Sequence, residues 1–597
     1  QDTYAGIVAG YAQKIQTNLN TTVVQGATVT GTNNGINFYT GSVTNAGAVT
    51  GTLASGIFAK TPAGTGTINV NNSGSITGGN YGINTFTDIA VTNSGTITGN
   101  SFGINSFDGA VSLTNSSMGT VSGGIIAGTS AIVTNFGSIT SGIITAGTSA
   151  TVTNSGSITG GISANTDAIV TNSGTIDGAG YNGISANNGA ATVTNSGNIT
   201  GGISANTDAI VTNSGTIDGA GYNGISANNG AATVINSGNI TGGISANTSA
   251  TVTNSGLITG DAAGVYASNG AATVSNSGTI AATGAGSYAV FANTTANVVN
   301  SGLITGDAAG VYANNGAATV NNSGTITAAA VNGIGIRAGT TGNVTNSGTI
   351  TATGAGGSAV YVNTDATVTN SGLITGNAAG IVSGTSAAVT NSGTITATAV
   401  NGVGILAGTT GNVTNSGTIT ATGAGGSAVY ANTAANVVNS GLMTGGAAGI
   451  KAGTSATVTN SGTIMGTGAT GIGIVAGATG NVTNSGTIIG VGGTAIQFNA
   501  NGTPGSDILT VLPGARFGGK VNFGGGADTV NFASGSWILN VSNFNKTLST
   551  VTTPGTPYLV TSNQIVVADV SGFGAQNRAI MDITWWINSV LPDAPVF

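Results

Sequence analysis

A short line close to V-x-N-S-G recurs along most of the chain and limits what the chain can fold into. With its Asn as the marker, the line occurs 21 times between Asn45 and Asn484, a repeat length of about 22 residues, which falls in the range of solenoid repeats. The intervals vary, the shortest running from Asn154 to Asn172 and the longest from Asn45 to Asn72. A fixed line with spacers of variable length indicates stacked turns whose corners differ in length while their sides stay the same.

Three aliphatic positions accompany the marker. Val stands two residues before the Asn in 20 of the 21 copies, and Leu113 replaces it in the other. A second aliphatic residue stands four residues after the Asn, except after Asn115, where Val121 takes its place. A third follows later in the repeat, as at Ile83 and Ile162. The neighbouring residues are Thr, Ser, Ala or Gly, so the local period of two indicates strands and excludes a helical stripe.

These features predict an all-β fold, a right-handed parallel β-helix (β-solenoid) with about 21 or more rungs of ~22 residues, capped at both ends. At about 4.8 Å per rung, the stack is expected to be roughly 100 Å long. We expect the N-S-G corner to need a positive φ, which Gly and Asn tolerate. We also expect the marker side chains to form a hydrogen-bonded ladder along the axis. The structural ladder residues singled out are Asn154, Asn172, Asn195, Asn213, Asn236 and Asn254.

The two ends of the chain depart from the repeat. Residues 1–40 are expected to form an N-terminal cap or docking segment, and residues 41–500 the solenoid repeats. Residues 501–597 hold six of the seven prolines and all three tryptophans, and are expected to end and cap the β-helix and to serve in assembly. The possible assembly residues are Tyr4, Tyr11, Trp537, Trp585, Trp586 and Phe597.

The composition excludes several classes of function. There is no Cys and no His, and all 15 acidic residues are Asp, so thiolate chemistry and histidine ligation are absent. Eight Lys and Arg residues spread over 597 cannot form a surface that follows nucleic-acid phosphates. The chain contains 106 glycines, which could suggest disorder, but 39% of its residues are apolar, which indicates that it folds. The first residues contain neither an initiator Met nor a signal peptide, which favours a processed, secreted chain.

Carboxylates are the only groups that suggest catalysis. Asp167 and Asp208, like Asp177 and Asp218, are equivalent positions two rungs apart, because residues 160–200 recur as 201–241. Glycoside hydrolysis needs two such carboxyls at roughly 5 to 10 Å, one with a raised pKa. The neighbours here are Gly, Ala, Thr and Asn, so we interpret these aspartates as solvated surface groups. We predict no catalytic residue, no cofactor and no metal.

Ordinary structural roles explain three other sequence patterns. The segment GGGADT at 524–529 resembles a calcium-binding repeat but occurs once and is expected to form a turn. The outward T-x-T pairs of ice-binding solenoids occur in only five rungs at the strand beginning with Thr96 and its counterparts, and strand propensity explains them. A series of tyrosines indicates corner packing or, alternatively, contacts with glycans or another copy. Its members are Tyr181, Tyr222, Tyr266, Tyr288, Tyr312, Tyr361 and Tyr430.

The C-terminal sequence carries a resemblance to a family. VLPGARFGGKVNFGGGADTVNF, followed by ADVSGFGAQNRAIMDITWWIN, resembles the end of the passenger region of bacterial autotransporters, and the Ser/Thr/Asn/Gly repeats are similar to those passengers. The resemblance implies a β-helix carried across the outer membrane by a β-barrel that follows it. This chain ends at VLPDAPVF, without the amphipathic strand series of such a barrel.

These observations predict a secreted bacterial cell-surface protein with a structural or adhesive role and no enzymatic activity. The favoured mechanism is self-association into a fibre, because the nearly uncharged surface opposes it little. The terminal segments would then form a contact that does not close. Two alternatives stay open: a monomeric, glycan-binding adhesin rod, and a polysaccharide-active β-helix enzyme. The expected partners are other copies of the chain, glycans or other cells, and no nucleic acid.

Overall fold

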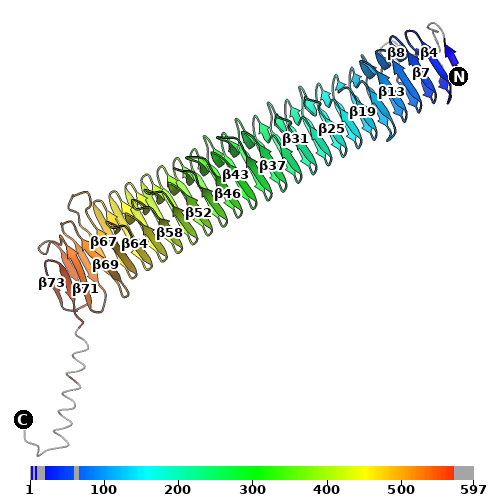
Figure 1. Ribbon diagram of the computed structural model, residues 1–597. Coiled ribbons are helices and arrows are strands. Elements are labelled where there is room, and N and C mark those ends of the chain that lie inside the picture. Colours follow the sequence, from blue (N-terminus) through cyan, green and yellow to red (C-terminus); the bar gives the residue numbers. More distant parts are fainter. Residues whose placement is uncertain (1, 5–6, 10–19, 60–65, 570–577, 579–597) are drawn as a thin grey trace, which may run out of the picture. The chain divides into compact units, whose positions relative to one another are not determined.

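The computed structural model describes residues 2–4, 7–9, 20–59, 66–569 and 578. It confirms the predicted fold class: the protein is all-β and forms a parallel β-solenoid of about 24 turns, ~22 residues apart (Figure 1). The chain divides into two compact units, residues 1–326 (unit 1) and residues 327–597 (unit 2). Both units are built from the same kind of turn.

Each turn contributes three short strands, as the turn around Asn213 in unit 1 shows. These strands are β30 (Ala209–Asn213), β31 (Thr216–Asp218) and β32 (Ile225–Ala227). Every strand pairs in parallel with its counterparts in the turns before and after, so β30 lies between β27 (Ala191–Asn195) and β33 (Ala232–Asn236). We call the sheet formed by strands like β30 the first sheet, and that formed by strands like β31 and β32 the second sheet.

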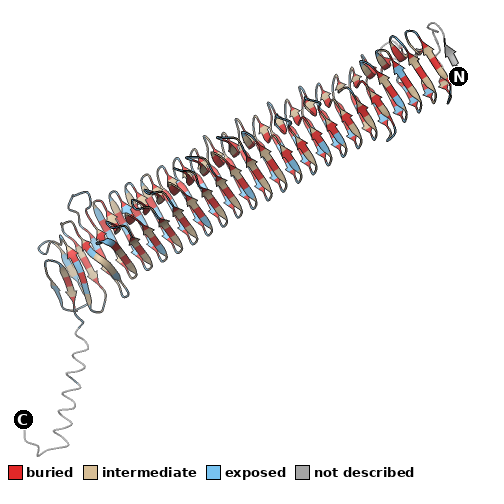
Figure 2. Ribbon diagram, viewed as in Figure 1, coloured by how far each residue is buried: buried red, intermediate tan, exposed pale blue. Residues whose placement is uncertain are grey.

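Buried positions recur in turn after turn of unit 1 (Figure 2), and aliphatic residues occupy most of them. Along β30, burial alternates: Ala209, Val211 and Asn213 point inward, and Ile210 and Thr212 face solvent. The register places Val211 directly between the corresponding valines of the adjacent turns. The other two aliphatic positions of this turn are the fully buried Ile217 and Ile225. The three aliphatic positions predicted from the repeat are therefore the core.

Unit 2 repeats this arrangement. One of its turns consists of β54 (Ala387–Asn391), β55 (Thr394–Ala397) and β56 (Val403–Ala407). Each strand again pairs in parallel with the next turn along the chain. Val389, Ile395 and Ile405 supply its buried side chains.

The glycine of the N-S-G corner has a different role from the one predicted. Among the described residues, neither the Asn nor the Gly of this motif has a positive φ in any copy, so the expectation of a left-handed corner is wrong. The physical reason for glycine is close packing between turns. A Cβ placed on Gly215 would overlap the carbonyl oxygen of Gly197 in the preceding turn, and Gly197 stands in the same relation to Gly174. Any side chain here would push adjacent turns apart.

This packing predicts the effect of a single methyl group. Gly215→Ala is expected to lower the stability of the surrounding turns by about 1 to 3 kcal/mol, because the clash is with backbone that cannot rotate away. Ser214→Ala, at the adjacent exposed position, is expected to stay within about 0.5 kcal/mol. Chemical unfolding followed by circular dichroism compares the two variants. Equal midpoints would show that the turn spacing adapts to a Cβ.

The first strands show how the stack begins. In unit 1, β1 (Asp2–Tyr4) pairs with β3 (Thr21–Val23), and β2 (Ile7–Ala9) with β4 (Thr28–Gly31), all in parallel. The solenoid pairing therefore extends into the segment that precedes the first marker, Asn45.

In unit 2, the first sheet continues through β68 (Ile508–Val511), β70 (Thr529–Phe532) and β72 (Thr550–Thr552). The second sheet ends differently, because β71 (Trp537–Ser542) and β73 (Tyr558–Val560) both pair antiparallel with β74 (Gln564–Val567).

Candidate functional site

The six marker asparagines singled out from the sequence form one continuous hydrogen-bonded ladder inside unit 1. The Nδ2 of each donates to the Oδ1 of the next at 2.8 Å. The same bonds link the markers from Asn45 to Asn322 in unit 1, and those from Asn346 to Asn484 in unit 2. All of the bonds run in the same direction, toward the C-terminus.

Each of the six singled-out amides also binds two backbone carbonyls. The Nδ2 of Asn213 donates to Asn236 Oδ1 at 2.8 Å, to Gly215 O at 3.1 Å and to Asn239 O at 3.2 Å. The side chain is only 1% exposed, so no ligand can reach it. Since buried polar groups need partners, the ladder satisfies the corner carbonyls of two successive turns. Its role is structural.

The predicted assembly residues are only partly within the described chain. Tyr11, Trp585, Trp586 and Phe597 lie outside the described residues. Tyr4 ends β1 and is paired in register with Val23. Trp537 opens β71 and is half-buried, with its Nε1 donating to Ala533 O at 3.2 Å and its ring 6.4 Å from that of Phe532. A role for these residues in assembly stays a prediction.

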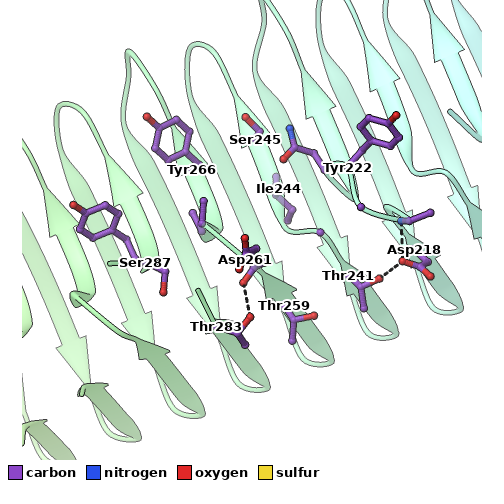
Figure 3. A pocket seen from close by; sticks show the side chains of 18 of the residues that line it. Asp218, Tyr222, Thr241, Ile244, Ser245, Thr259, Asp261, Tyr266, Thr283 and Ser287 are labelled. Atoms are coloured by element: carbon purple, nitrogen blue, oxygen red, sulfur yellow. Dashed lines mark hydrogen bonds between the residues drawn. The ribbon is translucent and has the colours of Figure 1, made fainter. Parts of the chain in front are cut away.

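A groove of about 870 Å³ on the surface of unit 1 is a candidate binding site (Figure 3). Its lining brings together three tyrosines, Tyr222, Tyr266 and Tyr288, with two aspartates, Asp218 and Asp261. The other lining residues are mostly small: Thr, Ser, Ala and Gly. The tyrosines and Asp218 stand out in the sequence, but the repeat pattern alone does not bring them together.

The groove results from differences in corner length between successive turns. The corner between the second and third strands has six residues in the Asn213 turn, two in each of the next two turns and five in the turn after those. The short corners leave a hollow between the two long ones. The strands that flank these four corners are β31 and β32, β34 (Asn239–Thr241) and β35 (Ile244–Ala246), β37 (Leu257–Gly260) and β38 (Ala263–Ala267), and β40 (Thr279–Ala282) and β41 (Tyr288–Ala292).

The tyrosines on the two sides of the groove differ in their surroundings. Tyr222 stands on the six-residue corner and is 63% exposed. Tyr266 is stacked on Phe291, with ring centroids 4.7 Å apart, and Tyr288 lies 5.5 Å from the same ring. Tyr312 extends this aromatic cluster, 5.4 Å from Phe291. One wall of the groove is therefore a packed aromatic platform, and the other is a single exposed ring.

Asp218 is oriented by two hydrogen bonds at the edge of the groove. Its Oδ1 accepts from the hydroxyl of Thr241 at 2.6 Å and from the backbone N–H of Ala220 at 3.0 Å. The Thr241 bond and then the Ala220 bond hold the pKa of this carboxyl below its ordinary value. Asp218 therefore stays ionised and acts as a hydrogen-bond acceptor, and it does not donate a proton near neutral pH.

The carboxyls with raised pKa values lie elsewhere, in the interior of unit 2. Asp507 and Asp528 are fully buried in adjacent turns, where the backbone N–H of Asp507 donates to Asp528 Oδ1 at 3.1 Å. Burial raises the pKa of Asp507 to about 7, and it also raises the pKa of Asp528. This pair was not predicted from the sequence. The signal was available, because Asp507 alternates with the inward-facing Leu509 and Val511.

The duplicated aspartates behave as surface groups that cap corners. Asp167 and Asp208 accept hydrogen bonds from the backbone N–H groups of Ala190 and Ala231, at 2.9 and 2.8 Å. Asp177 accepts from the Thr200 hydroxyl, as Asp218 does from Thr241. In each case the carboxylate ties one turn to the next.

Among the described residues, no group of three or more acidic residues is placed to hold a metal ion. The same part of the chain contains no helix long and apolar enough to cross a membrane. Comparison with protein-family models, with curated proteins and with solved structures gives no significant match.

Proposed function

We propose that this protein is a secreted, structural or adhesive component of a bacterial cell surface, and that it self-associates through the outer face of its first sheet. The observation that carries the proposal is a run of uncharged, exposed β-branched side chains along that face of unit 1, from β18 (Ala131–Asn135) to β33. The isoleucines of this run are about half exposed, and burying them against a partner is favourable.

The rows are regular. Parallel register aligns isoleucine and threonine alternately in one column of outward side chains: Ile132, Thr151, Ile169, Thr192 and Ile210. These isoleucines and Ile235 in the adjacent column are between 48% and 54% exposed. The face carries no charge, so two copies can approach without repulsion or the loss of hydrated ions.

The first and last strands of the first sheet support a second contact between copies. Within the described residues, β1 pairs with β3 and β72 with β70, and the outer edge of each terminal strand has no strand beside it. Unpaired edges are templates for adding another strand. A contact between these two unlike edges of different copies is heterologous, and such contacts, where they do not close into a ring, produce a filament.

The solenoid fold and the C-terminal sequence together support a finer proposal, that this chain is the passenger region of an autotransporter-type adhesin. The long parallel β-helix is the fold expected for such a passenger. Export then places the protein outside the cell. The chain contains no cysteine, so its stability there depends on no disulfide.

Electron microscopy of the purified chain without ligand tests self-association. We expect regular filaments or side-by-side bundles at physiological salt. The double variant Ile169→Asp and Ile210→Asp is expected to abolish bundling and to weaken self-association at least about tenfold, because it places two carboxylates in each uncharged face.

The matched control is Thr166→Asp with Thr207→Asp, which adds the same charge to the exposed corners of the same two turns. This control is expected to associate like the unmodified chain. Separate rods in every sample would exclude self-association and leave adhesion as the function. Equal loss in both double variants would show that net charge, and not this face, controls the association.

A further inference from the structure

We propose that the groove of unit 1 binds a segment of an uncharged polysaccharide. This proposal names the class of ligand for the adhesive function proposed above, and it rests on that function. Four properties of the groove support glycan binding: its aromatic walls, its polar lining, its charge and its length along the solenoid.

The aromatic walls suit the apolar faces of sugar rings. A pyranose presents C–H groups on its faces, and these pack against tyrosine rings while the phenolic hydroxyl stays hydrated. Tyr266 and Tyr288 are held by Phe291, so they lose little conformational freedom when a ligand binds. Tyr222, which is 63% exposed, is free to close on the ligand from the other side.

The polar lining suits the hydroxyl groups of a sugar. The hollow is also lined by the side chains of Thr241, Ser245, Thr259 and Ser287. Ser245 lies between Tyr266 and Tyr222, whereas Thr241 and Thr259 lie farther from the rings, on the side of the aspartates (Figure 3). Each hydroxyl both donates and accepts a hydrogen bond, as sugar hydroxyls do. Asp218 adds an ionised acceptor whose position is fixed by Thr241. A purely apolar ligand would displace water from these polar groups without offering them hydrogen bonds, which disfavours it.

The charge of the region excludes acidic glycans. The sequence contains no Lys or Arg between Lys60 and Arg337, whereas eight aspartates lie in that interval. Two of them, Asp218 and Asp261, line the groove. A uronic acid, sulfate or sialic acid would therefore meet only negative charge, at a cost that rises as salt is lowered.

The length of the groove fits a chain of several sugars better than a single sugar. The groove runs over four turns, from the Asn213 turn to the Asn276 turn. With turns spaced about 4.8 Å apart, it extends roughly 14 Å along the axis. The turn spacing is close to the length of one residue in an extended β-linked glycan, so successive sugars would meet successive turns in similar positions.

Isothermal titration calorimetry of the full chain tests the assignment with defined hexasaccharides. The neutral probes are cellohexaose, laminarihexaose, mannohexaose and N-acetylchitohexaose, and the charged probe is hexaguluronate. We expect at least one neutral probe to bind and hexaguluronate not to bind. Tyr222→Ala and Tyr266→Ala are each expected to lower the affinity about tenfold, the upper range for the loss of one aromatic contact. Tyr222→Phe, which keeps the ring, should retain most of the affinity.

The duplicated block supplies a matched control. Tyr181 occupies the same corner sequence in the first copy of the block and is also exposed to solvent, but it lines a separate hollow of about 450 Å³ that contains no second tyrosine. Tyr181→Ala should therefore bind like the unmodified chain, and unchanged melting temperatures would show that the variants are folded.

Three results would overturn the proposal: no binding by any neutral probe, equal binding of hexaguluronate, or an equal loss in Tyr181→Ala. Hydrolysis of a bound probe would make the site an enzyme instead of a binding groove. Filaments without glycan binding would contradict the glycan-binding proposal and support self-association. Glycan binding without filaments would support the glycan-binding proposal and contradict self-association.

Discussion

Replacement of Asn213 by aspartate is expected to destabilise unit 1 by about 3 to 5 kcal/mol at pH 7, because it leaves a buried, unpaired charge. The two side chains have nearly the same shape, so packing is unchanged. The carboxylate cannot donate, and it would face the acceptor oxygens of Asn236, Gly215 and Asn239. Desolvation favours the protonated form, so the loss should be smaller at pH 4 than at pH 7.

Thr212→Asp is the matched control, since it adds the same charge one residue earlier on the exposed face of the same strand. Hydrogen exchange of the β30 and β33 amides measures the local free energy of opening, which suits a repeat protein that need not unfold in a single step. Equal exchange rates in the two variants would show that the ladder contributes little to stability.

The second large effect concerns the buried pair Asp507 and Asp528. The folded-state pKa of Asp507 is raised to about 7, whereas an unfolded aspartate titrates near 3.9. Between these values the folded state binds more protons, so stability is full below about pH 4 and falls as pH rises through 7. The difference between the folded and unfolded pKa values of Asp507 corresponds to a loss of up to about 4 kcal/mol in the free energy of unfolding. The end of unit 2 should therefore be more stable at pH 4 than at pH 8.

Asp528→Asn is expected to reduce this pH dependence and to raise stability at pH 8. The asparagine Oδ1 can still accept from the Asp507 N–H, and its Nδ2 can donate to the Ser549 hydroxyl oxygen. The change removes one buried charge and the repulsion that contributes to the raised pKa of Asp507. Melting temperatures between pH 4 and pH 8 measure the effect.

Asp365→Asn is the control for this series, because Asp365 is exposed and hydrogen bonds from Thr385 and Ser386 lower its pKa. It should leave the slope between pH 4 and pH 8 unchanged. A wild-type slope of the opposite sign would show that the two buried carboxyls are ionised in the folded state.

The regular part of the structure could be predicted because each turn repeats the same local pattern. Val211, Ile217 and Ile225 are identifiable as core by their period of two, and their stacking follows from the spacing of the repeat. The role of Gly215 could not be read in this way. A glycine required by positive φ and one required by a neighbouring carbonyl look alike in sequence, and only the distance between turns distinguishes them.

The groove could not be predicted, for a different reason. Its walls come from Tyr222 and Tyr288, which belong to turns three apart along the solenoid, and the hollow exists because the corners between them are short. The relevant quantity is the difference in length between neighbouring corners, which no single repeat contains. The buried Asp507 was predictable in principle, since it occupies an inward position of an alternating strand.

The duplicated block shows what such a fold can do with a copy of itself. Residues 160–200 and 201–241 differ at one position, Thr194 against Ile235, so Tyr181 and Tyr222 began with the same surroundings. They now line hollows of about 450 and 870 Å³, one with a single tyrosine and the other with three. The difference comes entirely from the turns next to each copy. In a solenoid, a new surface can thus arise by moving an old segment beside a different neighbour, while its internal ladder and core stay as they were.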